Sequence, residues 1–378
     1  MVHCGMSRMN GGLGRLVVGG CFDGEAVLGP TAIIHRDGSI LAIEPARPGE
    51  AACHAFVLPT LVDAHVHVFL DGAVSEPEAR RRHHRRSPAE LAATADSNAA
   101  AAIGRGIGLV RDGGDPHGVN DGLRARLRAG SGRLTVRSPG PALHRPGRYG
   151  GFLGLAVPDD RDLAALVGQL AERADDIKVL LTGPIDVAQA AVHGQPQFDL
   201  AAARTIVATA RAHGRPAFAH ANGAAGIAVA IAAGFDSLEH GYLIDDESLR
   251  RMAGQGMAWT PTLAPLAASR GLAGALDRIL ADHAEAVARA ARLGVTVLCG
   301  SDAGGAGVPH GDGLIDEMLR LAAAGLPMAA LLRAATTVPR ARWGETAAGI
   351  RPGGVLDLVA LAASPFERPE ALRSARRA

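Results

Sequence analysis

The stretch Leu61-Val-Asp-Ala-His-Val-His-Val68 marks the point at which the pattern of the sequence changes. It is almost wholly apolar, and its histidines, His65 and His67, lie at its end, as expected for a buried strand that finishes in polar residues. Beyond it, one apolar strand and one Ala- and Leu-rich helix alternate along the chain. This alternation is typical of a parallel sheet covered by helices, and we therefore predict an α/β fold.

Eight strands can be assigned in this part of the chain. They are expected at residues 61–68, 108–111, 134–138, 177–181, 217–220, 237–240, 258–262 and 295–301. Eight strand–helix units form a (β/α)8 barrel of the TIM type, which takes about 250 residues of the 378 present. We predict such a barrel over residues 61–345.

The two ends of the chain have a different pattern. Before residue 60, short apolar runs are broken by turn residues such as Asp37-Gly38, which favours antiparallel hairpins. A further strand is expected at residues 355–361, after the turn Pro352-Gly353-Gly354. We predict that residues 1–60 and 346–378 together form a small β-sandwich.

Polar residues gather at the ends of the predicted barrel strands. They are His65, His67, Lys178, His220, His240 and Asp302. The carboxyl ends of the strands of a parallel barrel meet at one face, so these side chains should meet there. Residues two apart on a strand point the same way, which lets His65 and His67 bind one ion. Imidazole and carboxylate ligands suit Zn²⁺, and Mn, Fe, Co or Ni by the same chemistry.

Lys178 is the only lysine among the 39 lysines and arginines of the chain, and it lies in an apolar run. Burial favours the neutral amine. A neutral amine can take up CO₂ to form a carbamate, an anion with two oxygens that can bridge two cations. Arginine cannot do this, because its guanidinium stays protonated. This chemistry explains why a chain rich in arginine keeps a single lysine here.

At these residues the chain resembles the metal-dependent amidohydrolase superfamily. The resemblance rests on Leu58-Pro-Thr-Leu-Val-Asp-Ala-His-Val-His67, Lys178, Glu239-His240-Gly241 and Gly300-Ser301-Asp302-Ala303. Around Lys178 and His240 the chain is similar to the branch that holds prolidase-like dipeptidases and imidazolonepropionases. The resemblance implies a binuclear hydrolase that cleaves an amide (C–N) bond of a small molecule, with a dipeptide-like or N-acyl amino acid as substrate.

The resemblance also implies a role for each of the six residues. His65, His67 and Asp302 would bind the more buried of two divalent ions, most simply Zn²⁺, His220 and His240 the outer one, and carboxylated Lys178 would bridge both. A hydroxide between the ions would attack the carbonyl. Asp302 would accept its proton and pass it to the leaving nitrogen.

Other reactions stay open at this point. Deaminases of this superfamily tend to carry a glutamate shortly after the fifth-strand histidine, whereas His220 is followed by Ala221-Asn222-Gly223, which disfavours deamination. The same metal pair could hydrolyse a lactone or a phosphotriester. A scaffold of the amidohydrolase type without catalytic activity is a further alternative.

Residues near the expected mouth of the barrel are candidates for contacts with a substrate. They are Tyr242, Tyr149, Arg148 and His144. The arginine-rich run at residues 80–86 is interpreted as a solvated helix or loop face, which could fold over the mouth and offer an arginine to a substrate carboxylate. Asp63 and Asp112 are expected to form hydrogen bonds at strand ends.

Composition excludes several classes of partner. The formal net charge of +1 gives no long-range attraction to nucleic acid or to an anionic membrane. Residues 1–10 lack the apolar core of a signal peptide, and no apolar stretch is long enough to span a bilayer. The four cysteines show no Cys-x-x-Cys spacing, which favours isolated thiols. We expect a cytoplasmic enzyme, monomeric or homo-oligomeric, with a small-molecule substrate.

Overall fold

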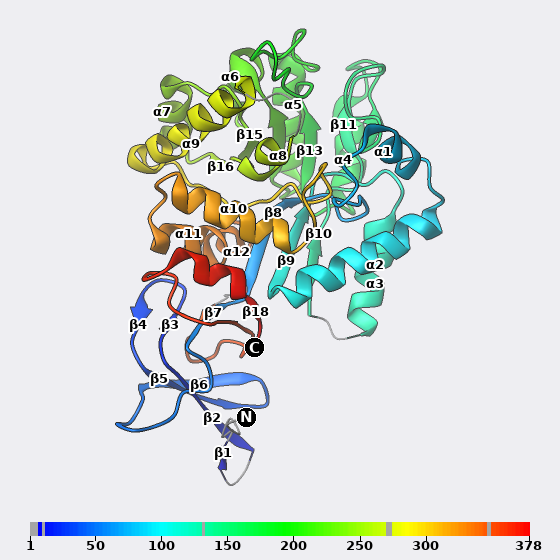
Figure 1. Cartoon of the computed structure of the whole chain (residues 1–378). Helices are drawn as coiled ribbons and strands as arrows, with labels where there is room; N and C mark the ends of the chain where they lie inside the picture. The colour runs from blue at the N-terminus through cyan, green and yellow to red at the C-terminus, as the bar shows by residue number, and fades with distance from the viewer. Residues whose placement is uncertain (1–6, 10–11, 131–132, 270–273, 346–348) are drawn as a thin grey trace.

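The computed structural model describes residues 7–9, 12–130, 133–269, 274–345 and 349–378. A large body of helices and strands carries a smaller β-rich part at one end, and the first and the last described strand lie in that smaller part (Figure 1). The strands are β1 Ser7–Met9, β2 Leu13–Val18, β3 Cys21–Phe22, β4 Val27–Leu28, β5 Thr31–Arg36, β6 Ser39–Pro45, β7 Phe56–Pro59, β8 Leu61–Val66, β9 Ile107–Asp112, β10 Thr135–Arg137, β11 Ala142–His144, β12 Gly154–Ala156, β13 Ile177–Leu180, β14 Ala217–Ala221, β15 Ser237–His240, β16 Ala258–Thr260, β17 Leu358–Leu361 and β18 Arg376–Arg377.

Helices separate most of the strands of the large body. They are α1 Pro77–His83, α2 Pro88–Gly104, α3 Val119–Ala129, α4 Leu163–Ala171, α5 Leu200–Ala212, α6 Gly223–Ala233, α7 Asp246–Gln255, α8 Leu263–Ala268, α9 Ala275–Leu293, α10 Asp312–Ala323, α11 Met328–Ala334 and α12 Thr337–Arg342, with a 3₁₀ helix at Pro369–Ser374. The predicted alternation of strands and helices is confirmed, and with it the α/β class.

The strands of the large body form two parallel sheets. One has the order β10-β9-β8 and the other β12-β11-β13-β14-β15-β16. The segment 295–303 connects them, because Val297 bridges to Trp259 of β16 and Ala303 bridges to Val66 of β8. The expected eighth strand is therefore present as single bridges and not as a continuous strand.

The predicted third strand, 134–138, is shorter than expected and is followed by a break. Its first part, β10, pairs with β9, whereas β11 pairs with β12 and β13. Between them lies Ser138-Pro139-Gly140-Pro141, and proline has no N–H to donate to a ladder. Because β10 and β11 belong to different sheets, the closed eight-stranded TIM barrel is not confirmed.

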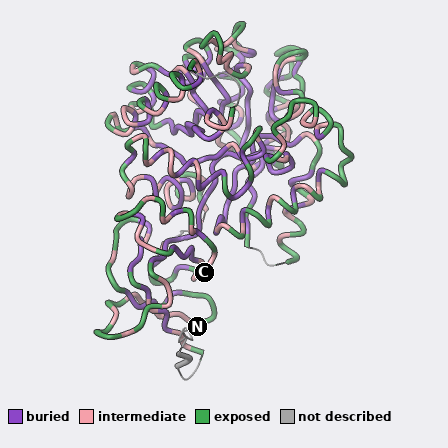
Figure 2. The backbone as a smooth tube through the Cα atoms, viewed as in Figure 1, coloured by how far each residue is buried: buried purple, intermediate pink, exposed green. Residues whose placement is uncertain are grey.

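The central strands are buried on both faces. Every residue of β8, β9, β13, β14 and β15 is buried. The inner segments in Figure 2 are accordingly purple, while exposed residues line the outer helices and loops. Parallel strands covered in this way need apolar residues almost throughout. A polar side chain on such a strand can reach solvent only where the strand ends, which is where the functional residues were expected.

The smaller part combines strands from both ends of the chain. It holds the sheet β1-β2-β5-β6 and the sheet β18-β17-β7-β3-β4, in which β17 runs antiparallel to β7. A cluster of buried residues that includes Leu16, Ile33 and Val57 packs there. The β-sandwich itself is not confirmed. The division into 1–60 with 346–378 and 61–345 stays a prediction, and residues 346–348 lie outside the described residues.

None of the helices in the described ranges is long and apolar enough to cross a bilayer. Cys21 and Cys299 are buried free thiols, but Cys53 is disulfide-bonded. For Cys53 the expectation of an isolated thiol is therefore wrong, because spacing along the chain does not reveal which residues meet in space.

Helix α10 carries a buried carboxyl group, that of Glu317. Glu317 is fully buried, its Oε2 accepts a hydrogen bond from the backbone N–H of Ala264 at 2.7 Å, and its Oε1 has no partner among the described residues. Burial raises the pKa of Glu317 from its ordinary value of 4.5 to about 8. The side chain is thus a neutral acid at neutral pH.

The pKa of Glu317 predicts how stability depends on pH. Above about pH 4.5 the unfolded chain has released this proton while the folded chain keeps it, so the free energy of unfolding falls as the pH rises toward 8. Glu317→Gln keeps an acceptor for Ala264 but cannot ionise. Denaturant titrations at pH 5, 6.5 and 8 should show the variant gaining stability relative to the parent as the pH rises. The exposed Glu247→Gln should run parallel to the parent, and parallel curves for Glu317→Gln would contradict the prediction.

Candidate functional site

A cavity of about 230 Å³ lies at the carboxyl ends of β8, β14 and β15, and β13 contributes to its wall. The structure brings all six residues of the predicted metal site into its lining: His65, His67, Lys178, His220, His240 and Asp302. They come from five segments that are far apart in the sequence and lie side by side here.

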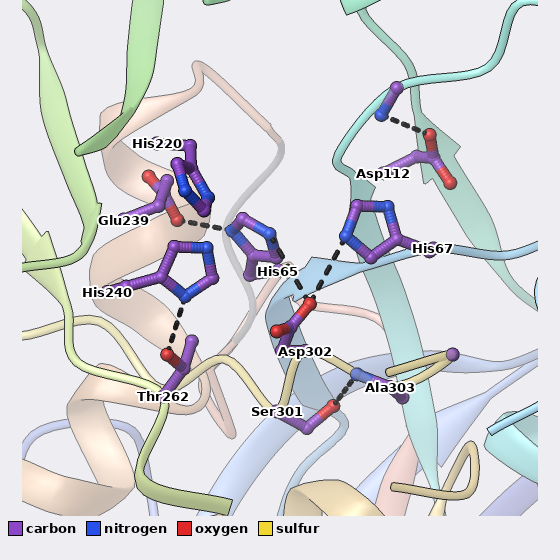
Figure 3. Close-up of polar contacts among 12 residues, drawn as sticks. His65, His67, Asp112, His220, Glu239, His240, Thr262, Ser301, Asp302 and Ala303 are labelled. Atoms are coloured by element: carbon purple, nitrogen blue, oxygen red, sulfur yellow. Dashed lines mark hydrogen bonds and ion pairs between the residues drawn. The ribbon is translucent and has the colours of Figure 1, made fainter. Parts of the chain in front are cut away.

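His65, His67 and Asp302 form the tightest group (Figure 3). The Nε2 atoms of the two histidines lie 3.7 Å and 3.2 Å from Oδ1 of Asp302. One potential ligand atom from each of the three residues lies within 4.8 Å of the others. Two imidazoles and a carboxylate in this arrangement can hold a divalent cation.

His220 and His240 form a second pair beside this group, with ring centroids 4.5 Å apart. Nδ1 of His240 hydrogen-bonds with Oγ1 of Thr262 at 2.8 Å, and Nε2 of His220 lies 3.3 Å from the carbonyl oxygen of Gly183. Each ring thus uses one nitrogen for a protein contact. The other nitrogen has no hydrogen bond to any described residue and is free to act as a ligand.

Lys178 is the most unusual side chain of the cavity. It is 1 % exposed, and its Nζ has no hydrogen-bond partner among the described residues. Nζ lies 4.6 Å from the centroid of the Phe218 ring. Nε2 of His65 and Nδ1 of His67 are likewise buried without partners. Unpaired buried nitrogens are costly, and a bound group that accepts their lone pairs fits this donor set.

Burial favours the protonation states that the binding of a metal ion requires. It lowers the pKa of Lys178 from 10.5 to about 8 and that of His220 to about 4, so a neutral amine and a neutral imidazole are accessible near neutral pH. Burial alone would raise the pKa of Asp302, but its hydrogen bond with His67 and the charges around it lower that pKa overall. Neutral imidazoles and a carboxylate are the forms that bind metal ions.

Glu239 contacts His65, and Arg111 in turn contacts Glu239. Neither residue was assigned a role from the sequence alone. Oε2 of Glu239 lies 2.7 Å from Nδ1 of His65, while its Oε1 accepts hydrogen bonds from Arg111 Nη2 at 2.6 Å and from Ser237 Oγ at 2.7 Å. A carboxylate behind a ligand histidine fixes its tautomer and orientation. A partial indication was present in the sequence, because Glu239 precedes His240 in the quoted motif. No local sequence pattern, however, indicates that Glu239 contacts residues 65 and 111.

Asp63 and Asp112 form the strand-end hydrogen bonds that were expected of them. Asp63 accepts from the backbone N–H of Ser301 at 2.8 Å, and Asp112 accepts from that of Val68 at the same distance. These bonds connect the loops after β8, β9 and segment 295–303. The bond from Ser301 to Asp63 fixes the backbone directly before Asp302.

The backbone itself is strained at this site. His240, Thr262 and Asp302 have φ angles of 65°, 50° and 56°, in the left-handed region that residues with a Cβ seldom adopt. Each such residue costs about 1–3 kcal/mol, and such conformations cluster at functional sites. The turns direct the side chains of His240 and Asp302 into the cavity.

The four predicted substrate contacts separate into two pairs. Tyr149 and Tyr242 line the cavity, whereas Arg148 and His144 do not. The hydroxyl of Tyr242 donates to the carbonyl oxygen of Thr262 at 2.8 Å, but that of Tyr149 has no partner within the described part of the chain. Arg148 is exposed and donates to the Gln195 carbonyl.

A family model for the amidohydrolase family matches residues 56–372 of the chain. Among curated proteins, an uncharacterised protein of Mycobacterium tuberculosis strain H37Rv is 29% identical over 337 residues, which cover 84% of this chain and 82% of that protein.

Solved structures share the fold over nearly the whole chain. A Xaa-Pro dipeptidase with bound methionine in its active site superimposes with a TM-score of 0.79 at 24% identity, covering 96% of both chains. A prolidase complexed with N-methylphosphonate-L-proline gives a TM-score of 0.75 at 23% identity, covering 96% of this chain and 97% of that one. At these identities the likeness shows the fold alone.

The contact between Glu239 and His65 predicts the effect of a conservative substitution. Glu239→Gln removes the anion that orients the ring, and the affinity for Zn²⁺ should fall by about 10- to 100-fold. The measurement is a competition titration with a chromophoric chelator. Ser237→Ala is the matched control, because Ser237 bonds to the same carboxylate without touching His65. Equal Zn²⁺ affinities for Glu239→Gln and the parent protein would show that the contact has no such role.

Proposed function

The chain belongs to the amidohydrolase family, and we propose from this that it is a binuclear metal-dependent hydrolase that cleaves an amide bond of a small molecule, with an N-acyl amino acid or a dipeptide as substrate. Family membership and the prolidase-like neighbours support a hydrolase of amide bonds. The binuclear centre and the substrate are the parts that we add.

The observation that carries the proposal is the unpartnered Nζ of Lys178 among four histidines and an aspartate. An ammonium group there would repel cations. The neutral amine, accessible because burial lowers the pKa of Lys178 to about 8, can instead add to CO₂, forming an N–C bond and releasing one proton. The resulting carbamate is an anion with two oxygen ligands, and it would complete the donor set for two ions.

The contacts of the six residues indicate which of them would hold each ion. Both His65 and His67 approach Oδ1 of Asp302 through Nε2, so these three residues would hold one ion. The nitrogens of His220 and His240 that form no hydrogen bond with a described residue would serve the second ion. Two divalent cations, most simply Zn²⁺, would acidify a water molecule and polarise the carbonyl of the amide.

Asp302 is the group of this chain that would move the proton. Its pKa is lowered overall, so it is a carboxylate at neutral pH and can accept a proton from the attacking water. Its side chain is 16% exposed and therefore reaches the cavity. Passing that proton to the leaving nitrogen would prevent the expulsion of an amide anion, which is the difficult step of amide hydrolysis.

The size and lining of the cavity support a small substrate. At about 230 Å³ it lies below the usual range of about 300–1,000 Å³ for drug-sized ligands. The names of two structural neighbours point to compounds of this size, since one binds methionine and the other a phosphonate derivative of proline. Lactones, phosphotriesters and a scaffold without catalytic activity are the alternatives.

Replacement of Lys178 tests the proposal. Lys178→Arg keeps the charge but cannot form a carbamate, so the purified protein should lose bound metal and its turnover should fall by about 1,000-fold or more, as expected when several kcal/mol of transition-state stabilisation is lost. Metal content is measured by mass spectrometry, and turnover with a panel of N-acyl amino acids, dipeptides, lactones and phosphotriesters.

A second variant separates the carbamate from a merely structural lysine. Lys178→Ala leaves room for a free carboxylate, so acetate or propionate added with Zn²⁺ should restore part of the metal binding and turnover. If Lys178→Arg retains both ions and full turnover, the carbamate is wrong. If the parent protein cleaves lactones or phosphotriesters and no amide in the panel, the substrate class is wrong.

A further inference from the structure

One arginine of the run at residues 80–86 reaches the cavity. Arg80 lines it, while Arg81 and Arg82 are 61% and 66% exposed and pair with Glu78 on the outer face of α1. Helix α1 is fixed at its start by Glu76, whose carboxylate accepts from the backbone N–H groups of the first turn. The helix therefore directs one guanidinium inward and its neighbours outward.

The contacts of Arg80 leave its charge uncompensated. Nη1 donates to the carbonyl oxygen of Val74 and Nη2 to that of Gly304, both at 3.0 Å. Its guanidinium forms no ion pair with any carboxylate in the described ranges, although it is partly buried. Two backbone carbonyls hold the group in place but use only two of its five N–H donors. The remaining donors are available to a ligand.

The charges around the cavity favour an anionic ligand group at Arg80. Its charged lining residues are Arg80, Lys178 and Asp302, besides the histidines. Under the proposed function Lys178 becomes an anion that, with Asp302, binds the two ions. Arg80 then remains as the cationic side chain of the lining. Arginine binds carboxylates through two parallel N–H···O bonds.

Tyr149 supplies a second donor in the same lining. Its hydroxyl can donate a hydrogen bond, and no described residue accepts one from it. The ring packs against His220 at a centroid distance of 5.3 Å and against Phe152 at 5.7 Å. The hydroxyl therefore belongs to a side chain whose position is fixed.

We propose that Arg80, assisted by Tyr149, binds the free carboxylate of the substrate and makes the enzyme selective for amides that carry one. The inference rests on the proposed function and deepens it. The rest of the wall is mainly apolar and includes Leu70, Phe152, Leu153, Ile185, Val187 and Leu266. The substrate class is therefore an N-acyl amino acid or dipeptide with a small apolar side chain.

Binding of an unreactive pair of ligands tests this without turnover. N-methylsulfonyl-L-leucine and its carboxamide differ only in the carboxylate, and neither contains a hydrolysable N-acyl bond. Calorimetry with the metal-loaded full chain should give a preference for the acid of about 10- to 100-fold, the effect of a charged hydrogen-bonded pair. Arg80→Met should bind both ligands with equal affinity. Arg80→Lys keeps the positive charge but lacks the two parallel N–H donors of the guanidinium, so its preference for the acid should lie between those of the parent and Arg80→Met.

Two further variants serve as controls. Arg81→Met removes an exposed arginine of the same helix and should keep the full preference, while Tyr149→Phe should lose part of it. If the parent protein binds both ligands equally or neither, or if Arg80→Met and Arg80→Lys keep the parent preference, the role of Arg80 is wrong. A loss of preference in Arg80→Met supports it even where the Lys178 variants contradict the carbamate, so failure of the two proposals can be told apart.

Discussion

The site depends on nitrogen atoms that the fold buries and leaves without a hydrogen-bond partner among the described residues. Lys178 Nζ, His65 Nε2 and His67 Nδ1 are such atoms, and each costs about 1–3 kcal/mol when unsatisfied. His240, Thr262 and Asp302 add backbone strain at the same place. A folded chain of marginal stability keeps such a cluster only where a bound group offsets it. Ligation by metal ions would offset this cost for the imidazole nitrogens, and the proposed carbamate would do so for Lys178.

The surrounding bonds explain why the cluster does not relax. Arg111 and Glu239 fix His65, and Asp63 fixes Ser301 and so the turn that carries Asp302. A Cβ at Gly300 would lie 2.8 Å from the backbone nitrogen of His65, so the two segments are as close as the chain permits. A rigid frame of this kind holds ligands in position before an ion binds, which lowers the cost of binding.

Much of this could be predicted from the sequence, for a physical reason. The alternation of strands and helices is local, and polar residues after apolar strands must lie at one edge, so the positions of His65, His220 and His240 followed from periodicity alone. Other features are not local. The interruption at Pro139 and Pro141 placed β10 and β11 in different sheets, and Arg111 meets Glu239 across 128 residues of sequence. Pairing of this kind has no periodic signature.

The arginine-rich run shows where periodicity stops being informative. The run at residues 80–86 contains seven neighbouring basic residues, and the sequence gives no reason to prefer one arginine over another. Only the direction of α1 determines that Arg80 reaches the cavity and Arg81 does not. That direction follows from the cap at Glu76 and from the Gly304 carbonyl, which lies two residues after Asp302. The same loop thus carries a proposed metal ligand and fixes the guanidinium. Because one short segment contacts both groups, the backbone between residues 302 and 304 sets the distance between the proposed carboxylate site at Arg80 and the proposed metal ligand Asp302. A fixed distance of this kind would favour substrates whose carboxylate and scissile bond are spaced to match it, which a flexible surface arginine could not achieve.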